Sequence, residues 1–363
     1  MHTDHVGSLL RPAAVLRARE GYASGRLALD ALRETEDAAI VHALNLQREV
    51  GLEIFTDGEI RRDAWMTDVA EAVDGFVEQH RMMTWHLPDG STLQEPSRGK
   101  VVASRLHQAA RITGYEMSFL SEHAPGPVKM TMPSPVAIAN GSFTAGVSDA
   151  AYRSREALLE ELVGIIRGEM LALVDDGVAY VQLDEGFAGY VQQFWYDTAT
   201  IEKTTDPLDR LADDIAAENA CLDVLPQGGV IRAAHICRGN SKSRWTATGS
   251  YDHVAERLFS DLHVDRFLLE YDSQRAGGFE PLRFVPKGKM VVLGLVSTKS
   301  AYLESQDDLL RRIDDAAKYL PADQLALSPQ CGFASVSEGN LLSEDDQWRK
   351  LELVVDTARL AWG

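Results

Sequence analysis

Short runs of β-branched and other apolar residues recur along the whole chain, and most are separated by longer stretches with helical periodicity. Apolar runs of this length that are bounded by turn residues predict strands. Eight such runs stand out, at residues 6–10, 53–57, 128–132, 180–184, 230–237, 266–271, 290–296 and 325–328.

Helical patterns lie between most of these runs. They cover residues 32–50, 153–176, 207–225, 253–262, 307–320 and 344–360. Strands that alternate with helices predict a parallel sheet with crossover connections, and eight strands are the number that closes a (β/α)8 barrel. We therefore expect an α/β fold with one TIM-barrel domain over residues 1–363. A doubly wound open sheet is the main competitor.

The stretch 75–127 interrupts the alternation, because it is too long for a single crossover. Its middle, HLPDGSTLQEPSRG, is a polar region of turn type. We expect an insertion here, a hairpin with irregular segments beside the barrel mouth.

Composition and charge narrow the class of partner. The 363 residues are 45% apolar, which is globular, and 36 basic against 55 acidic residues give a net charge of −19. Such a surface repels nucleic acid and anionic membranes, so small molecules are the expected partners; homo-oligomerisation stays open. Three cysteines are too few for a disulfide framework, and no export signal or long apolar segment is evident. A cytoplasmic protein with thiol or metal chemistry is expected.

Reactive side chains concentrate where the predicted strands end. In a (β/α)8 barrel these carboxyl ends and the loops that follow form the active site. The residues found there are Ser8, Arg11, Asp57, Glu59, Asp184, Glu185, His235, Cys237, Glu270, Asp272, Lys299 and Cys331.

The sharpest feature is the pair His235 and Cys237, since residues i and i+2 of a strand project from the same face. Glu270 ends the sixth predicted strand and Cys331 follows the eighth. Two thiolates, an imidazole and a carboxylate suit a tetrahedral zinc ion. An H-x-C pair alone more often marks a buried structural histidine and cysteine, and it is the two further positions that favour a metal site.

The charge of this donor set indicates its chemistry. Two thiolates and a carboxylate outweigh the charge of the ion, so the site is poorly suited to activating water. It suits a thiol better, because a thiol that coordinates zinc is deprotonated at neutral pH and becomes a nucleophile. The residues therefore favour a transferase that alkylates a thiol.

Seven segments, in this order and spacing, resemble the catalytic barrel of cobalamin-independent methionine synthase and its single-barrel relatives. They are HVGSLLRP, GLEIFTDGE, VKMTMPSP, VQLDE, HIC, LLEYD and SPQCGF. The resemblance implies a zinc ion held by His235, Cys237, Glu270 and Cys331. It also implies that the amino-acid end of homocysteine is held by Ser8, Glu59 and Asp184.

The chain also departs from the synthase. It has no duplicate N-terminal barrel, and the segment GLVSTKS stands where the synthase has its proton-shuttling histidine. The aromatic residue that covers the folate pterin has no counterpart after VKMTMPSPVAIAN, where Gly141 follows Asn140. Folate is therefore disfavoured as the methyl donor, and the identity of the donor stays open.

Other polar residues carry weaker assignments. We assign Lys299 and Asp184 to catalysis, Lys299 as a proton donor to the leaving group, with an ion pair inside the barrel as its alternative. Arg11 and Glu185 join the predicted substrate site, Arg11 as a clamp for a carboxylate. The cations that follow the His-Cys pair hold an anionic tail, or they are solvated loop charges or pair with nearby carboxylates. These are Arg238, Lys242 and Arg244.

Four functions remain under comparison. The first is an S-methyltransferase that acts on homocysteine or a related small thiol, in methionine biosynthesis. The second keeps the zinc-activated thiol but attacks an epoxide or another alkyl donor, as in the epoxyalkane:coenzyme M transferases, or acts as a lyase in reverse. The third is a metal-free barrel like the uroporphyrinogen decarboxylases, and the fourth a metal-binding accessory protein.

Overall fold

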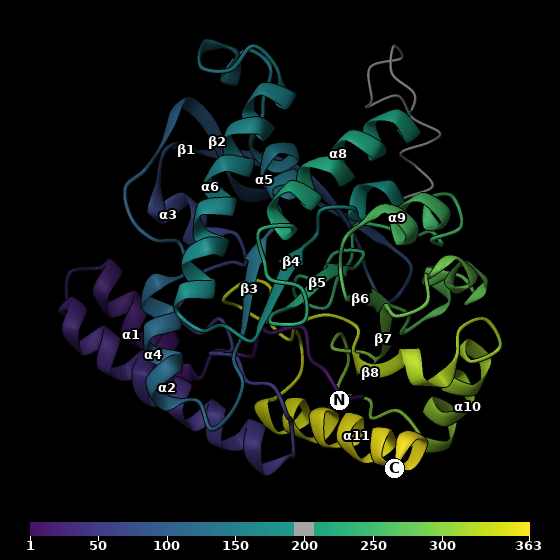
Figure 1. The fold of residues 1–363 in the computed structure, drawn as a ribbon. Coiled ribbons are helices and arrows are strands. Elements are labelled where there is room, and N and C mark those ends of the chain that lie inside the picture. The colour runs from purple at the N-terminus through teal and green to yellow at the C-terminus, as the bar shows by residue number, and fades with distance from the viewer. Residues whose placement is uncertain (192–206) are drawn as a thin grey trace.

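The computed structural model describes residues 1–191 and 207–363, and its centre is a parallel sheet of six strands in chain order (Figure 1). Each strand pairs in parallel with the next one along the chain. The strands are β3 (Lys129–Pro133), β4 (Tyr180–Asp184), β5 (Ile231–Ile236), β6 (Arg266–Glu270), β7 (Met290–Val296) and β8 (Leu325–Pro329). Six of the eight predicted strands are confirmed.

Extended N-terminal segments continue both edges of this sheet. Thr3 forms a parallel bridge with Leu327 of β8, and Phe55 forms one with Val128, directly before β3. The two segments also touch each other, since the amide of Leu9 donates to the carbonyl oxygen of residue 58 at 2.9 Å. Eight extended segments therefore follow one another around a ring, as the predicted (β/α)8 arrangement requires.

The first two of these segments are bridges rather than full strands. The predicted first strand, residues 6–10, is wrong in position, because the pairing with β8 falls at Thr3 and Asp4. Gly7 has a φ of +139°, and this conformation turns the chain out of an extended path just where the strand was expected to begin.

Helices surround the sheet and alternate with its strands. The predicted helices are confirmed as α2 (Leu29–Glu49), α6 (Arg155–Asp175), α8 (Pro207–Leu222), α9 (Ala255–Asp261), α10 (Gln306–Ala316) and α11 (Glu344–Trp362). Among residues 1–191 and 207–363, four further α-helices were not predicted: α1 (Ala13–Ala23), α3 (Thr67–Ala72), α4 (Gly114–His123) and α5 (Pro135–Ser142). Helix α11 runs beside the N-terminal segment (Figure 1), where the ring of His2 stacks on Trp362. Within the described ranges no helix has the length and apolarity needed to cross a membrane.

The segment expected as an insertion contains a long antiparallel hairpin of β1 (Val73–His86) and β2 (Thr92–Gln108). Its tip contacts the loop after β5, because His86 and Trp245 form an antiparallel bridge and Glu95 pairs with Arg244 at 2.6 Å. The predicted hairpin is therefore present. Its being an insertion relative to other barrels stays a prediction.

Buried polar contacts fill the end of the ring at which the strands begin. The carboxylate of Asp4 accepts from Lys129 Nζ at 2.9 Å and from the Tyr180 hydroxyl at 2.8 Å, and Arg266 lies 3.5 Å away. Asp4 and Lys129 are fully buried, so their charges have to be paired. A layer of apolar side chains packs in the same interior, formed by Val6, Ile54, Tyr180, Ala233, Leu268, Val292 and Ala326. The reactive side chains therefore have to lie at the opposite end of the ring, where the strands end.

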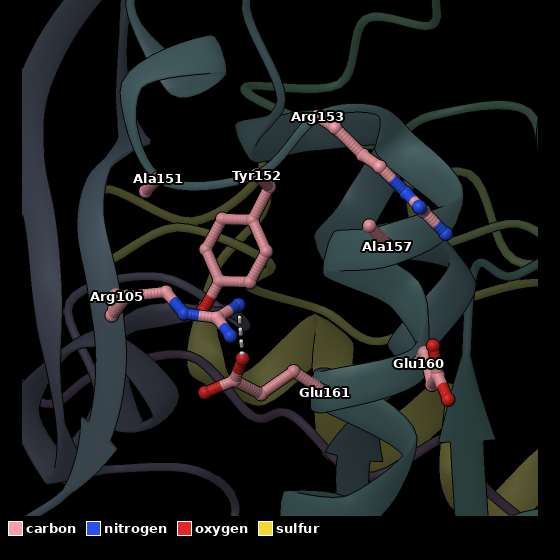
Figure 2. Close-up of a pocket in the computed structure, with 7 residues that line it drawn as sticks. All are labelled: Arg105, Ala151, Tyr152, Arg153, Ala157, Glu160 and Glu161. Atoms are coloured by element: carbon pink, nitrogen blue, oxygen red, sulfur yellow. Dashed lines mark hydrogen bonds and ion pairs between the residues drawn. The ribbon is translucent and has the colours of Figure 1, made fainter.

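A surface cavity of about 620 Å³ lies between β2 and α6. Figure 2 shows its lining, where Arg105 reaches across to Glu161 at 2.9 Å beside the ring of Tyr152. None of the reactive strand-end residues lines this cavity. The site must therefore be sought at the strand ends.

Candidate metal centre and active site

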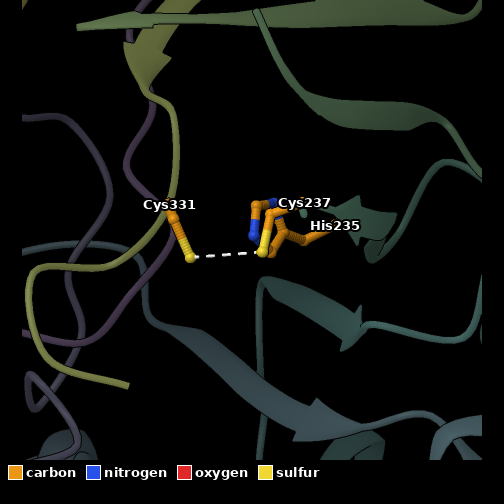
Figure 3. A group of neighbouring side chains, drawn as sticks. All are labelled: His235, Cys237 and Cys331. Carbon is orange, nitrogen blue, oxygen red and sulfur yellow. Dashed lines mark hydrogen bonds between the residues drawn. The ribbon is translucent and has the colours of Figure 1, made fainter. Parts of the chain in front are cut away.

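Three of the predicted ligands meet at the carboxyl ends of β5 and β8 (Figure 3). His235 lies on β5, Cys237 directly follows it, and Cys331 follows β8. Their donor atoms all lie within 4.8 Å of one another, and all three residues are buried. The i, i+2 spacing on β5 thus projects the imidazole and the thiol to one side, as predicted.

The histidine ring is oriented for coordination. Its Nδ1 lies 3.2 Å from the carbonyl oxygen of Leu268 on β6. Because a carbonyl oxygen can only accept, Nδ1 carries the proton and the lone pair of the neutral ring is on Nε2. Nε2 is buried and has no hydrogen-bond partner among the described residues. In the neutral form of the ring, which is the form that binds a metal, Nε2 would be a buried acceptor without a partner, and this is costly unless something else binds it.

The two thiols differ in acidity. The hydrogen bond between them, with the sulfurs 3.7 Å apart, lowers the pKa of Cys331 well below its usual value and raises that of Cys237. Burial lowers the pKa of His235, but its interaction with Cys331 outweighs burial and raises the value to about 9. The cluster is thus built around a thiolate in an enclosed, polar environment.

The donor set fits a zinc ion. Two cysteine sulfurs bound at about 2.3 Å to a tetrahedral zinc lie about 3.8 Å apart. The observed separation of 3.7 Å agrees with that value. The unpartnered Nε2 of His235 supplies the nitrogen donor. Sulfur and imidazole donors select zinc over magnesium or calcium.

The predicted fourth ligand, Glu270, does not join this group of donor atoms. It ends β6 with its side chain fully buried, and Arg275 binds its Oε1 at 2.8 Å. The backbone amide of Arg238 donates to Oε2 at 2.8 Å. Both carboxylate oxygens are thus engaged by other groups.

Glu185, predicted as a substrate residue, lies closer to the cluster. Its Oε1 is 2.7 Å from the sulfur of Cys237 and 3.9 Å from Nε2 of His235. Burial raises the pKa of Glu185. The residue has a φ of +66°, a left-handed conformation that is uncommon for non-glycine residues and is found at active sites as well as in turns.

The residues predicted for the amino-acid site lie at the carboxyl ends of other extended segments of the ring. Glu59 is buried, accepts from the Thr131 hydroxyl at 2.9 Å through Oε1, and leaves Oε2 without a partner among the described residues. Burial, reinforced by the charge of Glu59, raises the pKa of Asp184 to about 8. Ser8 lies against Gly332, where a side-chain carbon would come within 1.9 Å of the Ser8 oxygen. Gly332 therefore lets Ser8 sit next to the Cys331 loop.

Two other predicted residues make contacts that differ from their assignments. Arg11 donates to the backbone carbonyls of residues 9, 62 and 334. Its guanidinium thus braces three loops. Lys299 donates to the carbonyl of Gly239 at 3.0 Å and to Oδ1 of Asn240 at 2.9 Å, and so holds the loop after β5. The structure gives it no ion pair with Glu59 or Asp184.

The three cations after the His-Cys pair are occupied by groups of the chain. Arg238 is fully buried and donates to carbonyl oxygens of Gly249 and Glu270. Lys242 pairs with Glu338 at 3.1 Å, and Arg244 pairs with Glu95. The alternative of pairing within the chain is therefore the one that the structure supports.

Sequence reasoning missed one important residue of the site, Arg62. Its guanidinium binds both oxygens of Glu116, at 3.0 and 2.8 Å, and lies 3.4 Å from Asp68 and 4.0 Å from Glu59. The position three residues after Glu59 was a signal for it. The acidic partners, however, lie on helices that were not predicted.

The chain matches the family model described as "Cobalamin-independent synthase, Catalytic domain" over residues 1–359. It belongs to this family, and the resemblance seen in the sequence is confirmed. Among similar proteins, the uncharacterized proteins YxjH and YxjG of Bacillus subtilis are 36% and 37% identical, over 99% of this chain and 94% of theirs.

Proteins named methionine synthase are more distant. The one from Saccharolobus solfataricus is 22% identical, over 99% of this chain and 94% of its own length. A solved structure described as the "Putative Vitamin-B12 Independent Methionine Synthase" from Listeria monocytogenes is 28% identical. It has a TM-score of 0.74 and covers 100% of this chain and 98% of the other. The architecture is thus that of the catalytic barrels of this family.

Proposed function

We propose that this chain is a zinc-dependent thiol alkyltransferase, an S-methyltransferase that acts on homocysteine or a related small thiol, within a single barrel domain. The observation that carries the proposal is the buried cluster of His235, Cys237 and Cys331, with its donor atoms within 4.8 Å and Nε2 of His235 unpartnered. Membership of the cobalamin-independent synthase family and the relatives named methionine synthase support it.

Zinc, when bound by these three residues, would supply the positive charge that keeps a substrate thiol deprotonated at neutral pH. The protein's own contribution is to hold the thiol substrate that accepts the methyl group. The free Oε2 of Glu59 is a buried acceptor suited to an ammonium group, and Thr131 fixes the other oxygen. Asp184, whose pKa burial raises to about 8, becomes a better anion once an ammonium lies beside it.

The remaining residues enclose and shape the site. Lys299 fixes the loop after β5 through Gly239 and Asn240. In this loop the amide of Gly239 donates to the sulfur of Cys237 at 3.3 Å, and the hairpin tip contacts the loop at Trp245. Burial of the cluster excludes water, and this strengthens the electrostatic interactions between the thiol substrate and the protein.

The epoxide alternative is less well supported. A thiol that ends in a sulfonate requires free cations, whereas Arg238, Lys242 and Arg244 are all engaged by groups of the chain.

A comparison of two thiols tests the proposal. Homocysteine carries an ammonium group and 2-mercaptoethanesulfonate does not, so only homocysteine should depend on Glu59. We expect the wild type to prefer homocysteine, and Glu59→Gln to weaken homocysteine binding without changing the binding of 2-mercaptoethanesulfonate. A preference for the sulfonate, or equal effects of Glu59→Gln on both thiols, would contradict the proposed acceptor.

A further inference from the structure

Asn240 joins the two loops that carry the cysteines of the metal-type cluster. It lies in the loop after β5, shortly after Cys237, and its side chain is buried. Its Nδ2 donates to the backbone carbonyl of Gly332 at 2.7 Å. Gly332 directly follows Cys331 in the loop after β8. A single side chain thus ties the backbone next to one cysteine to the backbone next to the other.

The orientation of the Asn240 amide is fixed by its partners. Nζ of Lys299 and Nδ2 of Asn340 each lie 2.9 Å from Oδ1 of Asn240. Because an ammonium group can only donate, this end of the amide is the oxygen, and the nitrogen faces the carbonyl of Gly332. Asn340 is held in turn, since its Oδ1 accepts from the amide of Ser243 at 2.8 Å. Every polar atom of the Asn240 side chain therefore has a partner.

The loop after β5 depends on such contacts because part of its backbone is in an unfavourable conformation. Lys242 and Ser243 have φ values of +51° and +64°, which non-glycine residues adopt only when the surrounding structure holds them. Asn340 holds Ser243. The same loop contacts the cluster directly, since the amide of Gly239 donates to the sulfur of Cys237 at 3.3 Å. A shift of this loop would therefore change the surroundings of one of the two sulfurs.

We propose that Asn240 is a positioning residue that holds the two cysteine sulfurs at the separation a zinc ion requires. This inference rests on the proposed function only in requiring a metal at the cluster. The sulfurs of Cys237 and Cys331 are 3.7 Å apart, close to the value of about 3.8 Å expected for two sulfurs on one tetrahedral zinc. Because the bond from Asn240 to Gly332 fixes both loops before the metal binds, less ordering is required when it does.

Asn240→Asp tests the donated hydrogen bond, because it keeps the shape of the side chain and the acceptor for Lys299. It places a carboxylate oxygen against the carbonyl of Gly332, where the two oxygens repel each other. The neighbouring ammonium of Lys299 keeps the new carboxylate ionised. Charge and geometry predict opposite signs, since an added negative charge attracts zinc, whereas displacement of the Cys331 loop weakens its binding. We expect zinc to bind about 10- to 100-fold more weakly, measured on the full-length protein by competition against a chromogenic chelator.

Cobalt(II) provides a second readout, because its visible absorption bands depend on the geometry of the metal site. At saturating cobalt, Asn240→Asp should change these bands, whereas a purely structural loss of stability would leave them as in the wild type. Asn219→Asp is the matched control. Asn219 also links two segments, since it donates to the carbonyl of Asp261 and accepts from the amide of His263, each at 2.7 Å. It does so near the start of β6, at the other end of the barrel, and should change neither zinc affinity nor the cobalt bands.

Asn240→Ala serves as a second variant if Asn240→Asp fails to fold, with the same expected direction and no added charge. Zinc binding as tight as in the wild type or tighter, or wild-type cobalt bands, would overturn this inference and leave the proposed function intact. Equal losses in Asn219→Asp would also overturn it. Absence of zinc binding in the wild type would overturn both.

Discussion

Replacement of Arg62 best tests which contacts stabilise the proposed binding site of the thiol substrate. Its guanidinium is 3% exposed and makes a two-point contact with Glu116, with Asp68 and Glu59 at 3.4 and 4.0 Å. Arg62→Met keeps much of the side-chain volume but leaves these carboxylates without a cation. Loss of one partner of a buried ion pair costs about 3–5 kcal/mol.

We expect Arg62→Met to lower the free energy of unfolding by about 3 kcal/mol, near the lower end of that range, because the carboxylates left without a cation can take up protons. Burial already raises the pKa of Asp68 to about 7, so protonation near neutral pH is within reach. Urea denaturation at pH 7 measures the change in free energy of unfolding. Arg359→Met is the matched control, because Arg359 pairs with Asp356 on the surface and should contribute less than about 1 kcal/mol. A loss for Arg62→Met no larger than for the control would refute the reasoning.

Three further predictions concern the same end of the barrel. Burial, reinforced by Glu116, raises the pKa of Asp57 to about 7 from an unfolded value of 3.8. Stability should therefore fall as the pH rises from about 4 to 7, and Asp57→Asn should flatten this fall in urea denaturation, whereas parallel pH curves for both proteins would contradict it. Glu59→Gln should raise KM for homocysteine about tenfold or more, by loss of a charge-assisted hydrogen bond, and an unchanged KM would remove Glu59 from the acceptor site. The Lys299→Met variant should retain zinc but turn over more slowly, because the loop after β5 loses its contact at Asn240. Loss of zinc in elemental analysis would instead show that Lys299 stabilises the metal centre.

The periodic parts of the chain were predictable because their signals are local. Strands β4 and β7 have the predicted bounds, since each is a short apolar run between a turn and a polar loop. The pair His235 and Cys237 was predictable for the same reason, because strand geometry alone places both side chains on one face. Cys331 followed from the barrel order of the strands.

Other contacts of the candidate site could not be predicted from the periodic pattern of the sequence. Glu270 and Arg275 are only five residues apart, but their ion pair depends on the short turn Gln274–Ala276 after β6, which no periodic pattern describes. The assignment of Arg11 to a substrate carboxylate had the same weakness, since its partners are backbone carbonyls of three separate loops. The helix α5 was missed because its short apolar sequence follows β3 without an amphipathic pattern.

The central claim is that the chain holds one metal ion through His235, Cys237 and Cys331. Elemental analysis of the purified full-length protein tests it directly, with Cys237→Ser and Cys331→Ser beside Cys221→Ser as the matched control. Cys221 is also a free, buried cysteine but lies in α8, outside the cluster. The account predicts one zinc per chain in the wild type and in Cys221→Ser, and loss of zinc in the other two variants. A wild-type protein without zinc, or full zinc content in Cys237→Ser and Cys331→Ser, would contradict it.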